Sequence, residues 1–212
     1  MTCRAIVTGA SSGIGAAVVR KYSAMRYNVL GLSRSTGFDV SSKTAWDALC
    51  EKSGRCFDDV VLNAGVMAFS YDEESVMSRE ILHTNLMGVY YGLDAALRLV
   101  NPGGVVIVVS SACHDKPCPE TPIYAASKAG VHSMISSFQV RYGSRIRVFG
   151  VSPGYVSTNL GGQGGDIPLE LTDATMLGRP MSADEIAECI WSLRSGFLGL
   201  YGTDVRIDGG QI

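Results

Sequence analysis

The chain has 212 residues, of which 46% are hydrophobic and 18% are charged, and its formal net charge is −2. This composition is too apolar for a disordered protein, and the length suits one compact domain, residues 1–212, with a buried core. The 18 Lys and Arg residues form no basic run, so we expect no nucleic-acid partner.

The chain lacks the long apolar stretch that an export signal or a membrane span requires. Its densest apolar run, residues 105–109, is too short to cross a bilayer. We therefore expect a cytoplasmic protein with no membrane partner. The six cysteines are dispersed, which favours free thiols. Cys113, His114 and Cys118 form one local cluster, but they lack the spacing of a metal site, and we expect no metal there.

Apolar segments of strand length alternate along the chain with segments of helical spacing. We expect strands at residues 4–8, 28–33, 37–40, 59–63, 105–110, 145–151 and 203–208. We expect helices at residues 13–25, 44–51, 75–99, 122–142 and 182–195, the last with a capping box formed by Ser182 and Glu185. This alternation predicts an α/β fold, a doubly wound parallel sheet of about seven strands flanked by helices. Residues 155–181 are rich in glycine and show no periodicity, which is typical of a lid or binding loop.

A glycine-rich turn joins the first strand to the first helix. Gly9 permits a tight turn, Gly13 lets the backbone approach a diphosphate, and Gly15 lets the helix pack closely on the sheet. The helix start also offers free N–H groups to phosphates. The turn therefore predicts a dinucleotide site, although a glycine turn that serves only packing is the alternative. The residues expected to bind the cofactor here are Gly9, Ser11, Ser12, Gly13, Ile14 and Gly15.

Ser33 and Arg34 follow the second strand, where an acidic residue would favour NAD by binding its ribose hydroxyls. A hydroxyl followed by a guanidinium suits the 2′-phosphate of NADP instead. The alternative is a solvated surface arginine. We therefore expect NADP(H) to be preferred. Because the glycine turn holds no basic residue, NAD(H) remains possible.

Tyr124 and Lys128 are four residues apart in a predicted helix, so their side chains share one face. A nearby ammonium group lowers the pKa of a phenol, which makes Tyr124 a candidate acid–base catalyst for carbonyl reduction. Ser111 ends the central strand and could donate to a substrate oxygen, with Ser110 as its competitor. Taken alone, such a Tyr–Lys pair is more often structural than catalytic.

In combination, these motifs resemble the short-chain dehydrogenase/reductase family over nearly the whole chain, and a 3-oxoacyl-carrier-protein-reductase-like member in particular. The resemblance implies a Rossmann-type fold, an NAD(P)-dependent enzyme and a small carbonyl or alcohol substrate. Beside the glycine turn, it rests on Asp39-Val40, Asn63-Ala64-Gly65, Asn85, Ser111, Tyr124 with Lys128, Pro153-Gly154 with Thr158, and Asp208-Gly209-Gly210.

The resemblance also implies a role for each matching residue. Tyr124 would be the acid–base catalyst, Ser111 would orient the carbonyl, and Lys128 would bind the nicotinamide ribose and lower the pKa of Tyr124. Asn85 would hold a water molecule in a proton relay, and Thr158 would meet the carboxamide of the nicotinamide. The remaining residues expected to bind the cofactor are Ser33, Arg34, Asp39, Val40, Asn63, Ala64, Gly65, Pro153, Gly154 and Val156.

Two departures from the family pattern stand out. Residues 34–39 leave no room for the helix that usually links the second and third strands, and Leu62 replaces the usual Asn. Two other functions remain open: a 3-oxoacyl-thioester reductase, and a non-catalytic dinucleotide sensor. By analogy with the family, we expect a homodimer or homotetramer. His83 and His132 are interpreted as helix-face residues without a carboxylate partner.

Overall fold

The computed structural model of the chain describes residues 2–68, 76–116, 118–160 and 175–211. Its main sheet has six parallel strands in the order β2-β1-β3-β4-β5-β8. The strands are β1 Arg4–Thr8, β2 Asn28–Leu32, β3 Phe57–Leu62, β4 Val100–Val109, β5 Arg147–Pro153 and β8 Asp204–Ile207. The predicted doubly wound α/β fold is therefore confirmed.

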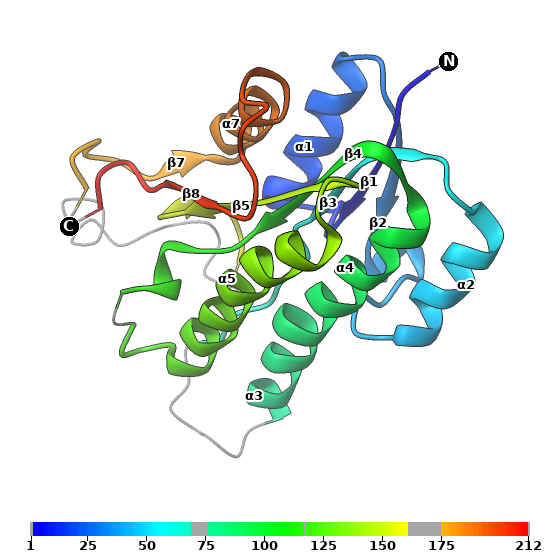
Figure 1. The fold of residues 1–212 in the computed structure, drawn as a ribbon. Coiled ribbons are helices and arrows are strands. Elements are labelled where there is room, and N and C mark those ends of the chain that lie inside the picture. Colours follow the sequence, from blue (N-terminus) through cyan, green and yellow to red (C-terminus); the bar gives the residue numbers. More distant parts are fainter. Residues whose placement is uncertain (1, 69–75, 117, 161–174, 212) are drawn as a thin grey trace.

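Helices cover both faces of this sheet (Figure 1). They are α1 Gly13–Ala24, α2 Lys43–Ser53, α3 Val76–Ile81, α4 Gly88–Leu99, α5 Pro122–Tyr142 and α7 Ala183–Gly196. One face packs on α1 and α7, and the other on α2, α4 and α5. Alternate residues of β4 enter the two cores, Val106 and Val108 on one side and Val105 and Ile107 on the other. This explains why β4 is apolar at successive positions.

The predicted strand at residues 37–40 is wrong. Residues Arg34–Thr36 form a 3-10 turn, Gly37 adopts a left-handed conformation with φ of 79°, and the Phe38 amide donates to the carbonyl of Ser33 at 3.0 Å. A further parallel strand beside β2 needs a crossover of about a dozen residues, and this segment is much shorter. In the part of the chain that the structure describes, β2 is therefore the edge of the sheet.

The predicted helix over residues 75–99 is confirmed from Val76 onward, with one irregularity. Between α3 and α4, the segment Leu82–Met87 is a π-helix. Such segments displace one residue from the regular helical surface and occur often at functional sites. Here the segment carries Asn85, whose side chain is fully buried.

The predicted loop at residues 155–181 lies largely outside the described residues. Its described ends pair as two short strands, β6 Val156–Ser157 and β7 Met181–Ser182. The predicted capping box is confirmed, because the Ser182 hydroxyl accepts from the Glu185 amide and the Glu185 carboxylate accepts from the Ser182 amide. Among the described helices, none has both the length and the apolar character that a membrane span requires.

Candidate active site

The glycine turn sits between β1 and α1 at the carboxyl edge of the sheet. Gly9 and Gly13 have φ of +67° and +52°, a region that residues with a Cβ rarely adopt. A Cβ on Gly15 would lie only 2.1 Å from the carbonyl oxygen of Gly9. Ser11 and Ser12 are exposed beside the helix start, and the first turn of α1 carries no acidic side chain. The turn therefore presents an uncompensated helix N-terminus, which suits a diphosphate.

Asn63 and Ala64 are held against this turn by Thr8. The Thr8 hydroxyl accepts from the amides of both residues, at 2.9 and 3.1 Å, and the Asn63 side-chain amide donates to the Thr8 carbonyl at 3.0 Å. The predicted cofactor segments after β1 and β3 are thus brought together at one edge of the sheet.

Arg34 lies beyond the end of β2, where a 2′-phosphate was expected to bind. Its side chain is 70% exposed and donates to the carboxylate of Glu80 on α3 at 2.7 Å. A pair this exposed contributes little stability, so the guanidinium is available to a stronger anion. Ser33 is buried beside it, and its amide donates to the Thr36 hydroxyl at 2.9 Å.

Asp39 and Val40 occupy the turn that leads to α2. The Asp39 carboxylate accepts from the amide and the hydroxyl of Ser41, at 2.9 and 2.8 Å, which is a local turn motif. Val40 is buried, and its carbonyl accepts from the Trp46 indole at 2.9 Å. Together these bonds fix the segment expected to face the adenine.

The segment after β5 returns toward the glycine turn. A Cβ added to Gly13 would meet the methyl carbon of Thr158 at 3.3 Å, so these two predicted cofactor residues are neighbours. The amide of Gly154 donates to the Ile207 carbonyl at 3.0 Å, which holds the residues after Pro153 beside β8. Val156 is half-buried and pairs with Met181.

Ser111 and Tyr124 meet where β4 ends and α5 begins. Tyr124 lies in the first turn of α5, which starts at Pro122, and only 6% of the residue is exposed. Burial raises the pKa of Tyr124 above its ordinary value, and the hydrogen bond between its side chain and that of Ser111 acts in the opposite direction. The Ser110 hydroxyl is buried and has no hydrogen-bond partner among the described residues. Ser111, not Ser110, is therefore the serine beside Tyr124.

Lys128 lies one turn further along α5 and is buried. Its ammonium group donates to the carbonyl of Val109 at 3.0 Å and lies 5.7 Å from the centre of the Tyr124 ring. Burial lowers the pKa of Lys128 to about 8, while the charge of Asp204 opposes this change. The expectation that Lys128 lowers the pKa of Tyr124 is not met in this structure, because burial raises this pKa and Lys128 is not among the groups that shift it.

Asn85 links the segment after β3 to α5. Its side-chain oxygen accepts from the Val66 amide at 2.8 Å, and its side-chain amide donates to the Val66 carbonyl at 2.9 Å. The same amide donates to the Ser127 hydroxyl at 3.2 Å, which in turn donates to the Tyr124 carbonyl at 2.6 Å. Gly65 lies next to Asn85, since its added Cβ would come within 3.4 Å of the Asn85 oxygen. Asn85 therefore braces the site in addition to any role in proton transfer.

An open pocket adjoins Tyr124. It is lined by residues that follow β3, belong to α3 or begin α5, and most of their side chains are apolar. These residues are Ala68, Met77, Ser78, Ile81, Thr121, Pro122, Ile123 and Tyr124.

The interpretation of His132 as a residue without a carboxylate partner is wrong. Its Nδ1 lies 3.2 Å from the Asp204 carboxylate, and its ring stacks on that of His114 with centroids 4.2 Å apart. Sequence reasoning missed this cluster because Asp204 and His132 are separated by 72 residues. Cys113 and Cys118, which the sequence grouped together, lie close in the structure: burial and then a hydrogen bond with Cys113 raise the pKa of Cys118 to about 12.

One protein family and several individual proteins are similar to this chain over most of its length. The family described as enoyl-(acyl carrier protein) reductase matches residues 30–211. An uncharacterised short-chain type dehydrogenase/reductase of Sinorhizobium fredii is 31% identical over 97% of this chain, which spans 43% of that relative's length. The 3beta-hydroxysteroid dehydrogenase 1 of Eggerthella lenta is 30% identical over 97% of this chain and 92% of its own length.

The fold is shared with solved structures. The crystal structure of BdcA in complex with NADPH superposes with a TM-score of 0.87 at 23% identity, covering 99% of this chain and 94% of that one. The family match extends over most of the chain, and the relatives agree with it. The chain therefore belongs to the short-chain dehydrogenase/reductase family and is an oxidoreductase.

Proposed function

We propose that the chain reduces a carbonyl group to an alcohol with NADPH, and that Tyr124 supplies the proton. The observation that carries this proposal is the contact of the Tyr124 phenol with Ser111 at the edge of a pocket. Ser111 follows the carboxyl end of β4, and Tyr124 meets it from the first turn of α5, at the edge of the sheet where such folds bind their ligands.

The electrostatics of Tyr124 favour the reductive direction. Since burial raises its pKa, the phenol is protonated at neutral pH and can donate to an oxygen that gains negative charge. In the proposed reaction, hydride adds to the carbonyl carbon and the Tyr124 proton goes to the carbonyl oxygen. The Ser111 hydroxyl would donate a second hydrogen bond to this oxygen and hold it beside the phenol.

The residues around the glycine turn fit a dinucleotide. Gly9 and Gly13 keep side chains away from the backbone at the helix start, where the diphosphate would bind, and Gly15 lets the helix pack against this turn. Arg34 would pair with a 2′-phosphate. NADPH, when bound, supplies the hydride. Thr158 lies beside Gly13 and would meet the nicotinamide carboxamide. Asp39 and Val40, in the turn before α2, would face the adenine.

Lys128 would bind the nicotinamide ribose and add positive charge near Tyr124. Its bond to the Val109 carbonyl uses only one of the three protons of an ammonium group, so further donors remain for hydroxyl groups. Asn85 would keep the start of α5 aligned through Ser127.

The pocket indicates the substrate class. Met77, Ile81, Pro122 and Ile123 give it an apolar wall, Ser78, Thr121 and Tyr124 are its polar lining residues, and Ser111 meets it only through the Tyr124 phenol. We propose a carbonyl compound with an apolar body. A ketone of this kind would bury its body against α3 and present its oxygen to Tyr124.

An assay of NADPH absorbance tests the proposal. The purified chain is mixed with NADPH and a panel of apolar ketones, quinones, polar sugars and 3-oxoacyl thioesters. We expect turnover that is fastest with apolar ketones. Preference for 3-oxoacyl thioesters would assign the substrate to the alternative reductase class, and tight NADPH binding without turnover of any compound would point to a sensor.

A further inference from the structure

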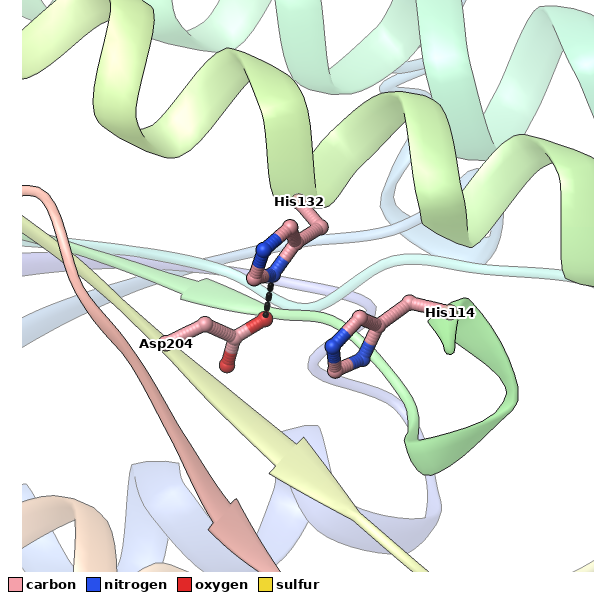
Figure 2. Close-up of side chains that lie close together, drawn as sticks. All are labelled: His114, His132 and Asp204. Carbon is pink, nitrogen blue, oxygen red and sulfur yellow. Dashed lines mark hydrogen bonds and ion pairs between the residues drawn. The ribbon is translucent and has the colours of Figure 1, made fainter. Parts of the chain in front are cut away.

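Three side chains outside the proposed reaction centre converge from three different elements. His114 ends the 3-10 turn Ala112–His114 after β4, His132 lies on α5, and Asp204 begins β8. Figure 2 shows the three side chains facing one common space. One nitrogen or oxygen atom from each side chain lies within 4.8 Å of the other two.

Asp204 is the buried member of this cluster, with 1% of its side chain exposed. One carboxylate oxygen accepts from the Ser152 hydroxyl at 2.8 Å and faces Nδ1 of His132 at 3.2 Å. The other oxygen is buried and has no hydrogen-bond partner within the described residues. Gly150 leaves the space for the group, since an added Cβ would lie 2.8 Å from the Asp204 carboxyl carbon. The charge of Asp204 acts on the buried ammonium group of Lys128, but this carboxylate oxygen has no donor of its own within the described residues and can accept a further cation.

His114 is held in the tautomer that a metal ligand needs. Its Nδ1 lies 2.7 Å from the carbonyl oxygen of Ser111. Because a carbonyl oxygen can only accept, Nδ1 must carry the proton. The lone pair of a neutral His114 ring is then on Nε2, on the opposite edge. A backbone carbonyl that fixes the ring in this way is a common second partner of metal-bound histidines.

We propose that His114, His132 and Asp204 bind one divalent transition-metal ion of the Zn²⁺ class. Two imidazole nitrogens and one carboxylate oxygen, with a water molecule as fourth ligand, are a donor set that Zn²⁺ accepts. Metal–ligand bonds of about 2.0–2.2 Å place the ligand atoms roughly 3.5 Å apart, so the site must contract slightly from its present spacing.

His132 can supply this contraction. Its side chain is about half exposed, and its ring now stacks on His114 at an interplanar angle of 9°. Rotation out of the stack would turn the His132 lone pair toward Asp204 and His114, which are both held by hydrogen bonds to Ser152 and Ser111. Two ligands are therefore anchored and the third is free to close on the ion.

None of the three ligand residues lines the pocket beside Tyr124. The proposed metal site shares Ser111 with the reaction centre only through the backbone carbonyl, whereas the hydroxyl of Ser111 faces Tyr124. Metal binding can therefore be measured without substrate or cofactor, and its outcome does not depend on the proposed reductase activity.

Titration of the chelator-stripped protein with Zn²⁺ in a calorimeter tests the proposal. We expect one equivalent to bind per chain. His132→Ala should weaken binding by at least about 100-fold, because loss of a group that only hydrogen-bonds to a metal ligand already weakens metal binding by up to about 100-fold. The matched control is His83→Ala, which removes an exposed histidine elsewhere on the chain and should bind Zn²⁺ like the unmodified protein. Zn²⁺ should also raise the Tm of the unmodified chain and of His83→Ala, but not that of His132→Ala.

The free cysteines need a separate control because thiolates also bind Zn²⁺. Co²⁺ bound to the proposed site should lack the near-ultraviolet thiolate charge-transfer band and should bind equally well to a Cys113→Ser/Cys118→Ser double variant. No saturable binding of Zn²⁺, unchanged affinity in His132→Ala, or a Co²⁺ thiolate band lost with the two cysteines would each overturn the proposal.

Discussion

Lys128 and Val109 join α5 to the central strand: the buried ammonium group of Lys128 donates to the Val109 carbonyl at 3.0 Å. Val109 is the last residue of β4, two positions before Ser111, and Lys128 lies one turn beyond Tyr124 on α5. The bond therefore fixes the two elements that carry the proposed proton donor and the proposed carbonyl-orienting hydroxyl. Its cost is the burial of a charge, which is visible in the lowered pKa of Lys128.

Replacing Tyr124 by Phe should remove the proton donor and leave the fold intact. The two side chains have nearly the same shape, and the lost hydroxyl is the atom that contacts Ser111. We expect kcat for ketone reduction to fall by about 10²- to 10⁴-fold, the usual contribution of a general acid. NADPH affinity, measured by fluorescence, and Tm should change little. Tyr201→Phe, at a residue that is 53% exposed, is the matched control and should retain full kcat. Full turnover by Tyr124→Phe would contradict the proposed role.

The buried ammonium group of Lys128 should make stability depend on pH. Its pKa is about 8 in the folded chain and 10.5 when unperturbed, so between these values the unfolded chain binds the extra proton. Stability must therefore rise with pH in this window, because the folded state no longer buries a charge. Relative to Lys128→Met, the unmodified chain should gain about 1 kcal/mol in free energy of unfolding between pH 8 and 9. Urea titrations of both proteins at the two pH values measure the difference, and a constant difference would show that Lys128 keeps an ordinary pKa.

The sequence predicts the fold well because its periodicities are local. Strand-length apolar runs and the glycine turn identify β1 and α1 to within a residue, as does the capping box for the start of α7, whereas β4 begins at Val100, five residues before the predicted strand. The error at residues 37–40 arose because the alternation of segments suggested a strand where the connection is too short to cross the sheet. Chain length between elements, and not residue type, decides that point.

Prediction of the site was less complete. Tyr124 and Lys128 share a helix, so their spacing alone places them together. The cluster of His114, His132 and Asp204 depends on which face of α5 packs over β8 and on the space left by Gly150, and neither can be read from spacing. The pKa of Tyr124 escaped prediction for a similar reason, since burial is a property of the packed chain.

Arg34 should determine the preference between the two dinucleotides. Replacing it by Ser removes the guanidinium that follows β2 and now pairs with Glu80. We expect kcat/KM with NADPH to fall by about 10-fold or more, with little change for NADH, because a charged hydrogen bond contributes about 1.5–3 kcal/mol. Steady-state kinetics with both cofactors measure this. Arg20→Ser is the control, since Arg20 is also an exposed, ion-paired arginine but lies far along α1 and pairs with Asp184. Equal loss with NADH and NADPH would contradict a role in binding the 2′-phosphate.

Replacing Gly15 by Ala should destroy the glycine turn. The new methyl group would lie 2.1 Å from the Gly9 carbonyl oxygen and 2.6 Å from the Asn63 side-chain nitrogen, and the first of these is backbone that cannot move without opening the turn. We expect a loss of at least about 3 kcal/mol in stability, the upper end for overpacking, and a fall in Tm of roughly 6–12 °C. NADPH binding should weaken with it, since the same turn would hold the diphosphate. Gly196→Ala is the matched control: it lies at the end of α7 with open space around the added Cβ, so alanine should be neutral or slightly stabilising there. Thermal unfolding and cofactor titration of both variants measure the contrast. A Gly15→Ala protein with unchanged Tm and NADPH affinity would mean that α1 can move away from β1 without cost, which the close packing of the turn does not allow.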